Sequence, residues 1–207
     1  MTILTRLATS LNRKDEQPNV ELARKVVDEA DKEAIQELID NVAHKDKNIQ
    51  SDCIKVLYEI GALEPELIAF HAQTFIDLLD HKNNRLVWGA MTALDAIALV
   101  NPQVIFSALP TILEVADKGS VITKDHGVNI LIKLCSMDSY SEKVFPQLIA
   151  QLENCPTNQL PMYAENAMPI INGNNRTVFV ETLLSRLIEI EKDSKRKRVE
   201  KVIKKLS

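Results

Sequence analysis

A spacing of 37 residues recurs along this chain and limits its possible folds more than any other feature. One apolar position of the period is occupied by Leu57, Leu94, Leu131 and Met168. Three more series share the spacing: Ile60, Ile97, Leu134 and Ile171; the small residues Cys53, Ala90, Gly127 and Ala164; and Ile39, Ile76, Leu113 and Ala150. A period of this size is typical of stacked supersecondary units, each of which needs its neighbours to bury an apolar face. The spacing therefore predicts a repeat array.

The composition favours helices as the repeated elements. Five glycines and eight prolines among 207 residues are too few for a chain with many tight β-turns. Pro18 breaks the helix pattern near the start, and Asn19 is expected to cap the helix that follows. Periodicity and cap signals predict paired helices at 2–13 with 19–30, 32–44 with 48–62, 65–80 with 84–99, 102–117 with 120–136, 140–153 with 158–171, and 175–190 with 193–206.

These repeats resemble the HEAT-repeat family of α-solenoids, which is related to the armadillo repeats. The segment from Leu86 to Ile97 is similar to that family's second helix, with an apolar start, a small residue four positions on and paired apolar positions. Pro110 and Pro146 resemble the proline that bends its first helix. The family's basic residue early in the second helix is kept only at Lys124, so we expect stacking to depend on apolar burial.

The resemblance implies an all-α, right-handed α-solenoid of about six antiparallel helix pairs. A repeat array has no second core to separate, so we predict a single domain over residues 1–207. Within it we expect four regular repeats at 31–172 and divergent terminal repeats at 1–30 and 173–207.

Charge is distributed unevenly along the chain. The formal net charge is −4, but residues 192–205 carry +6 and residues 1–191 carry −10. The acidic charge of residues 1–191 repels phosphate backbones, so we do not expect nucleic acid as a partner. Apolar residues spaced as on one helix face predict an amphipathic last helix that caps the array, with cations outside: Val199, Val202, Ile203 and Leu206. Docking of these cations to an acidic partner, or to RNA or an anionic surface, is the alternative.

The second helix of each repeat carries a predicted binding stripe. If positions 53, 56, 57 and 60 face the core, a turn of about 100° per residue directs 51, 55 and 58 outward. The resemblance implies that second helices line the concave surface of the solenoid. Carried through the period, the candidate binding residues on this concave stripe are Lys55, Tyr58, Trp88, Thr92, Asp95, Asp125, Asn129, Ile132, Met162 and Asn166.

Two chemistries on the stripe favour another protein or an extended peptide as partner. Trp88 is the only tryptophan of the chain, and Trp and Tyr are frequent interface anchors. The alternative is that Trp88 packs sideways on a neighbouring helix. Asn129 and Asn166 lie 37 residues apart, and their amides offer both donors and acceptors to a peptide backbone. The arrangement resembles part of the Trp and Asn array of armadillo-repeat proteins.

The sequence contains no recognisable catalytic or metal-binding motif. The four histidines are scattered, and Cys53, Cys135 and Cys155 have neither zinc-ligand nor redox spacing, so we expect all three thiols to be reduced. No apolar run is long enough to cross a bilayer, and the first residues lack the order of a signal peptide. We therefore predict a monomeric, cytoplasmic, non-catalytic scaffold or adaptor without cofactor or metal. The alternative that the resemblance permits is a HEAT-like nucleic-acid-binding or DNA-repair glycosylase-type protein.

Overall fold

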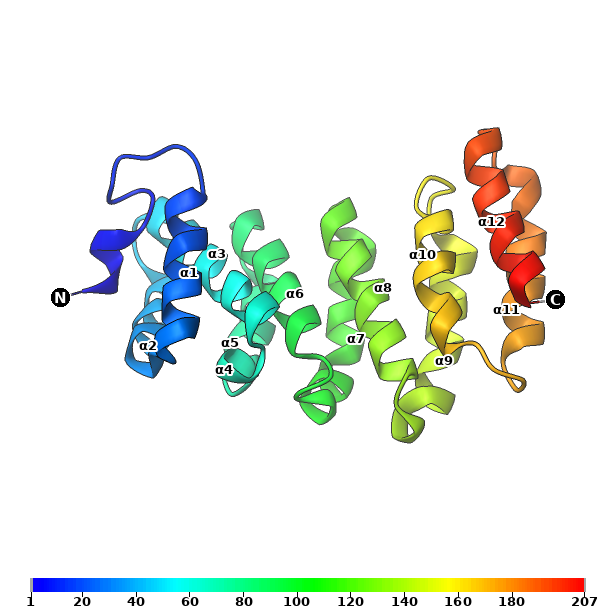
Figure 1. Cartoon of the computed structure of the whole chain (residues 1–207), viewed down its shortest axis with the longest axis horizontal. Helices are drawn as coiled ribbons and strands as arrows, with labels where there is room; N and C mark the ends of the chain where they lie inside the picture. Colours follow the sequence, from blue (N-terminus) through cyan, green and yellow to red (C-terminus); the bar gives the residue numbers. More distant parts are fainter. Residues whose placement is uncertain (1, 207) are drawn as a thin grey trace. The chain divides into compact units, whose positions relative to one another are not determined.

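The computed structural model describes residues 2–206, and over this range the chain consists of helices and loops without a strand (Figure 1). Residues 1 and 207, which the predicted domain includes, lie outside the described range. The α-helices are α1 (Gln17–Glu29), α2 (Lys32–Asp40), α3 (Lys47–Leu63), α4 (Glu66–Ala69), α5 (Ala72–Asp77), α6 (Asn84–Ile97), α7 (Pro102–Lys118), α8 (Val121–Cys135), α9 (Asp138–Asn154), α10 (Leu160–Ala167), α11 (Arg176–Arg186) and α12 (Asp193–Leu206). Short 3-10 helices add η1 (Ile3–Arg6), η2 (Asn41–Ala43), η3 (Leu78–Asp80), η4 (Met168–Ile170) and η5 (Leu187–Glu189).

Two predicted first helices differ from the structure. The helix predicted at 2–13 is wrong: only η1 is helical, because the chain turns to an extended conformation at Leu7 and reaches a left-handed one at Asn12, with φ 56°. The helix predicted at 65–80 is divided into α4, α5 and η3, with a break at Phe70 and His71. Pro110 and Pro146 do lie inside helices, in α7 and α9.

Asn19 has a different role from the predicted cap. Helix α1 already begins at Gln17, and Asn19 lies in its first turn with no exposed surface. Its Oδ1 accepts a hydrogen bond from the Ala8 N–H at 2.9 Å, and its Nδ2 donates to Asp52 Oδ1 at 2.8 Å. The other carboxylate oxygen of Asp52 accepts from the Thr9 N–H at 2.7 Å. This buried network joins the N-terminal turns to α1 and α3, because buried polar groups need partners.

The described chain divides into two compact units, which we call unit 1, ending at Gly127, and unit 2, beginning at Val128. The division falls inside the continuous helix α8, and the prediction of a single domain stays a prediction. The charge imbalance follows this division. Residues 1–127 contain 13 Lys and Arg against 20 Asp and Glu, whereas residues 128–207 contain 12 against 9.

Unit 1 has two layers of helices. In one layer α3 packs between α1 and α6, and in the other α2 packs against α4, and α5 against α7. The predicted core positions of α3 and α6 are wholly buried, among them Leu57, Ile60, Leu94 and Ile97. Helices α3 and α6 approach closely at Gly89, where an added Cβ would lie 2.7 Å from Ile54 Cγ1. The apolar contact between neighbouring second helices therefore holds this unit together, as the sequence predicts.

In unit 2, α9 packs against α11 and α10 against α12. Leu131 and Leu134 are buried at the predicted core positions, but Met168 and Ile171 are only half-buried. The difference arises because α10 ends at Ala167 and the chain is extended by Ile171. In the first-helix series Ala150 is exposed, so the period persists there without a core role.

Candidate functional site

The predicted stripe is divided between the two units, and each part is described separately. Unit 1 contains its residues on α3, α6 and the first half of α8, which are Lys55, Tyr58, Trp88, Thr92, Asp95 and Asp125. Unit 2 contains its residues on the second half of α8 and on α10, which are Asn129, Ile132, Met162 and Asn166.

An aromatic pair joins α3 to α6 in unit 1. The ring centroids of Tyr58 and Trp88 lie 5.7 Å apart, with an angle of 52° between the ring planes. Tyr58 is buried, whereas Trp88 is half-buried and keeps part of its surface accessible. This spacing and tilt lie within the range of favourable aromatic pairs. Trp88 therefore both packs on its neighbour and presents a face to solvent, which combines the two alternatives left by the sequence.

Lys55 also contacts the ring of Tyr58. Its Nζ lies 4.8 Å from the centroid of the Tyr58 ring, 2.7 Å from Glu59 Oε1 and 3.1 Å from Glu16 Oε2. Burial of Lys55 disfavours its charged form, but the bonds to Glu59, Tyr58 and Glu16 outweigh burial and raise the pKa of Lys55 above its usual value. Burial raises the pKa of Tyr58, because the charged form of this side chain is the deprotonated one. We call Trp88, Tyr58, Lys55, Glu59 and Glu16 the aromatic cluster, in which Trp88 is the accessible ring.

Sequence reasoning missed both carboxylates of the aromatic cluster. Glu59 follows Lys55 by four residues on the same helix, a spacing that predicts an ion pair and was available as a signal. Glu16 lies far away in the sequence, at the N-cap of α1, and no local pattern indicates its contact with Lys55.

Two stripe residues of unit 1 do not face solvent, and that expectation is wrong for them. Tyr58 is only 8% exposed, and both Lys55 and Trp88 pack against its ring. Asp95 is 7% exposed because it is turned toward α8, where its Oδ2 lies 2.7 Å from His126 Nδ1. Thr92 is half-buried, and its hydroxyl donates to the Trp88 carbonyl at 2.8 Å. The outward direction taken from one helix alone ignores such neighbours.

The amide pair predicted in unit 2 is present. Asn166 Nδ2 donates to Asn129 Oδ1 at 3.5 Å, so the 37-residue period brings the two side chains together. Asn166 is exposed and Asn129 is half-buried, as are the flanking Ile132 and Met162.

Beside the amides, α12 contributes cations that bind α10. Arg198 forms two hydrogen bonds with Glu165, from Nε to Oε1 at 2.9 Å and from Nη2 to Oε2 at 2.5 Å. Hydrogen bonding by Arg198, together with the charges of Lys201 and Lys205, lowers the pKa of Glu165. Sequence reasoning placed the cations on an outer face but missed Glu165, which precedes Asn166 on α10.

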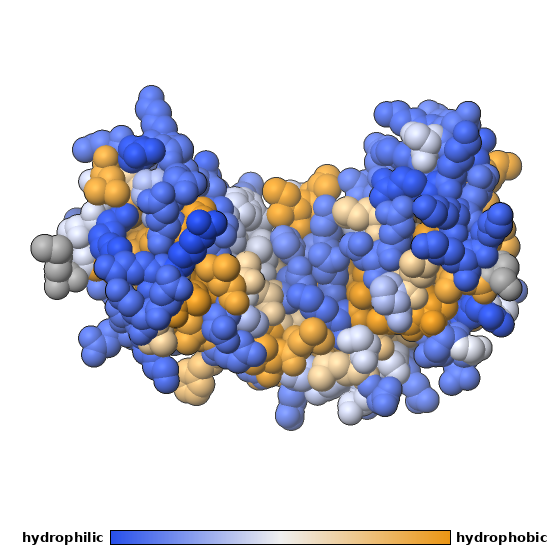
Figure 2. All heavy atoms as spheres, in the orientation of Figure 1, coloured by the Kyte–Doolittle hydropathy of each residue, from blue (hydrophilic) through white to orange (hydrophobic). Residues whose placement is uncertain are grey.

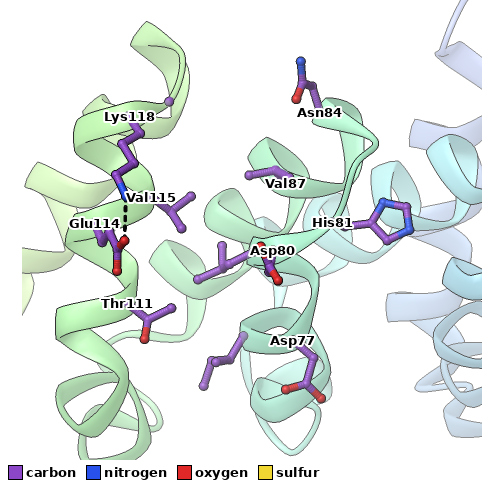
Figure 3. A pocket seen from close by; sticks show the side chains of 12 residues that line it. Asp77, Asp80, His81, Asn84, Val87, Thr111, Glu114, Val115 and Lys118 are labelled. Carbon is purple, nitrogen blue, oxygen red and sulfur yellow. Dashed lines mark hydrogen bonds and ion pairs between the residues drawn. The ribbon is translucent and has the colours of Figure 1, made fainter.

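A wide cleft of about 660 Å³ lies elsewhere in unit 1, between the end of α5, the start of α6 and α7 (Figure 3). Figure 3 shows Glu114 and Lys118 joined by an ion pair on α7, across the cleft from Asp77 and Asp80. All four side chains are exposed, and no buried acid, base or nucleophile converges there among the lining residues. Across residues 2–206, no group of three or more His, Cys, Asp or Glu is arranged to hold a metal ion.

Neither a family model nor a curated protein matches this chain. Solved structures that are similar to it include designed armadillo repeat proteins and an engineered protein. A designed armadillo repeat protein in complex with the peptide (KR)4 aligns over 99% of this chain and 100% of its own, with a TM-score of 0.69 and 15% identity. Computationally designed armadillo repeat proteins for modular peptide recognition align over 98% of this chain and 99% of their own, with a TM-score of 0.66 and 14% identity. An engineered protein aligns over 99% of this chain and 100% of its own, with a TM-score of 0.63 and 18% identity.

At such identities the likeness establishes the fold and nothing more. The chain has an all-α, armadillo-like solenoid fold, which confirms the predicted fold class. The HEAT type of the repeat, the right-handed superhelix and the number of pairs stay predictions. Within the described residues, none of the helices combines the length and apolarity that crossing a bilayer requires.

Proposed function

We propose that this protein is a non-catalytic scaffold or adaptor that binds another protein, or an extended peptide, at the aromatic cluster of unit 1. Trp88 is the anchor, and its accessible face is the contact. The partner is a polypeptide, and the protein works as a monomer in the cytoplasm. Catalysis, cofactors and metal ions have no part in this function.

The observation that carries the proposal is a single half-buried Trp88 supported by a second ring. Tyr58 fixes the orientation of Trp88 from α3, and Lys55 fixes Tyr58 through its contact with the ring and its bonds to Glu16 and Glu59. A ring that is already held in place loses little conformational freedom when a partner covers it. Half-buried Trp residues of this kind are common among the few residues that dominate binding energy.

The solved structures support the architecture that the proposal needs. One of the designed armadillo proteins is in complex with the peptide (KR)4, and others were designed for peptide recognition. Those ligands belong to those proteins, and the sequence identity of 14–15% transfers no residue role to this chain. The likeness adds only that a solenoid of this size and helix order can present a peptide-binding surface.

The test compares the removal of two accessible aromatic rings from the same unit. Trp88→Ala should weaken partner capture from an extract of the native host by about 30-fold, since loss of an anchor costs about 2 kcal/mol. Phe70→Ala is the matched control, because Phe70 is 94% exposed and lies in the other helix layer. It should leave capture unchanged.

Stability separates binding from packing in the same experiment. Because Trp88 is half-buried, its removal should lower the free energy of unfolding by less than the roughly 3 kcal/mol typical of a fully buried ring. The proposal is wrong if Trp88→Ala lowers the free energy of unfolding by about 3 kcal/mol and the folded variant still captures partners as well as the wild type does. Equal losses of capture in both variants would also count against it.

A further inference from the structure

One side of α12 carries a row of cations directed at α10. Arg198, Lys201 and Lys205 are spaced three and four residues apart, so they share one side of the helix. Arg198 contacts Glu165 of α10 directly, and Lys201 and Lys205 are near enough for their charges to act on the same carboxylate. Figure 2 shows hydrophilic residues covering this part of unit 2.

Two of these cations form no ion pair within the described residues. Glu165 binds Arg198, and the structure shows no ion pair for Lys201 or Lys205, which are both exposed. The only acidic residues of α12 itself are Asp193, which pairs with Arg196, and Glu200. The row therefore holds a net positive charge that a capping helix does not need, since a cap requires only a polar outer face.

The amide pair lies beside this row. Asn166 follows Glu165 on α10, and Asn166 in turn donates to Asn129 on α8. A side-chain amide has two N–H donors and a carbonyl acceptor, and the bond to Asn129 uses only one donor of Asn166. Asn166 is exposed, so a peptide group that reaches it can exchange hydrogen bonds with it.

We propose that these residues form a second interaction surface, the amide–cation face of unit 2, which binds an extended acidic segment of a polypeptide. Its members are Asn129, Asn166, Arg198, Lys201 and Lys205. The amides hold the backbone of the segment, and the two lysines bind its carboxylates. This surface does not include Trp88, so it stands independently of the function proposed for unit 1.

The composition of the face favours a peptide over a nucleic acid or a lipid surface. Glu165 binds Arg198 and is influenced by the charges of Lys201 and Lys205, so it would repel a continuous row of phosphates but can be avoided by spaced carboxylates. The groups beside the amides are Ile132 and Met162, which provide no ring on which a base could stack. Amides that bind donors and acceptors alike match a peptide backbone better than a lipid headgroup.

The test uses a labelled peptide of alternating glutamate and serine and measures fluorescence anisotropy with the full-length protein at low ionic strength. The double variant Lys201→Gln and Lys205→Gln should weaken binding about tenfold, since each exposed charge contributes modestly. Lys197→Gln with Lys204→Gln is the matched control, because it removes the same charge from exposed positions of α12 outside the row of Arg198, Lys201 and Lys205. It should weaken binding by less than about twofold.

Further arms identify the ligand class and the contribution of the amides. Asn166→Ala should weaken binding of the acidic peptide and leave the melting temperature of the protein unchanged. A peptide of alternating lysine and serine should not bind to the wild-type protein. Trp88→Ala should bind the acidic peptide as the wild type does, so a failure here is distinct from a failure of the unit 1 proposal. Equal effects of the two lysine pairs, no binding of the acidic peptide, or tighter binding of a single-stranded oligonucleotide or phosphatidylserine vesicles would overturn the proposal.

Discussion

Arg186 shows at the residue scale how one side chain can hold several elements together. It is 8% exposed, and its guanidinium donates to the carbonyls of Leu152 at 2.7 Å, Glu153 at 2.6 Å and Cys155 at 3.0 Å. Its Nε also donates to Glu189 at 2.8 Å. The last carbonyls of a helix have no partner within that helix, so Arg186 of α11 caps α9 from outside.

We expect Arg186 to be intolerant of substitution. Arg186→Met would remove four hydrogen bonds and leave buried carbonyls without partners, at a cost of about 3 kcal/mol. Arg186→Lys should recover little of this, because an ammonium cannot reproduce the planar fork that reaches three carbonyls. Urea unfolding followed by circular dichroism measures both. A lysine variant as stable as the wild type would contradict the capping role.

The buried thiols provide a second prediction at the residue scale. Burial raises the pKa of Cys53 and that of Cys135 from 9.0 to about 12, so at pH 8 only about one thiol in 10,000 is ionised. Each thiol has a higher pKa in the folded protein than in the unfolded chain. Its contribution to stability is therefore complete below pH 9 and is lost as the pH rises toward 12.

Iodoacetamide at pH 8 should therefore label these thiols far more slowly in the native protein than in guanidinium. The contribution of these two thiols to stability should also decline as the pH rises above 9. Mass spectrometry of timed samples measures the labelling, and native rates equal to the unfolded ones would contradict the burial of both thiols.

At the scale of elements, α12 has a buried apolar stripe on one face and a cationic surface on another. Val199 and Val202 are buried against unit 2, while Lys197 and Lys204 are exposed. The helix packs against α10 and α11, and so closes unit 2 at its last element. A capping helix of this kind depends on its apolar stripe for stability and on its outer face for solubility.

We expect the two faces of α12 to respond differently to substitution. Val199→Ser with Val202→Ser should destabilise unit 2 by about 3 kcal/mol or more, because two buried apolar contacts are replaced by hydroxyls. Lys197→Gln with Lys204→Gln should leave the melting temperature unchanged, since exposed charges contribute little. A large loss of stability from the lysine changes would argue against the capping role.

At the scale of the whole molecule, the period predicts that a complete repeat can be removed. Deleting residues 84–120 takes out α6 and α7 and joins the end of η3 to α8. The core positions then stay in register, with Gly127 in place of Ala90 and Leu131 in place of Leu94. Because solenoid contacts are mostly between neighbours, the shortened chain should remain helical and melt cooperatively.

Deleting residues 84–101 is the control for that prediction. It removes α6 alone and places α7, a first helix, directly after η3 and against the apolar surface of α3. This chain should be much less stable, with a broad thermal transition by circular dichroism. If both deletions behave alike, the 37-residue period is not the unit of folding.

The sequence alone determined most of the helical elements and the core of the second helices, and it placed Asn129 and Asn166 one period apart. These follow from local periodicity and from a repeat that sets which positions are neighbours. Short-range patterns failed where a distant group decides the outcome. Ala8 and Asp52 make Asn19 a buried connector instead of a cap, and His126 turns Asp95 inward.

The tertiary structure alone decided which of the stripe residues are exposed and which distant residues contact them. Periodicity gives the direction of a side chain on one helix, but exposure depends on what the neighbouring helix places there. Tyr58 is buried because Trp88 and Lys55 pack against its ring, and Lys55 is held by Glu16 at the N-cap of α1. Glu165 becomes part of the cationic face because Arg198 reaches it from α12. Contacts over such sequence distances carry no local signal, so only the fold reveals them.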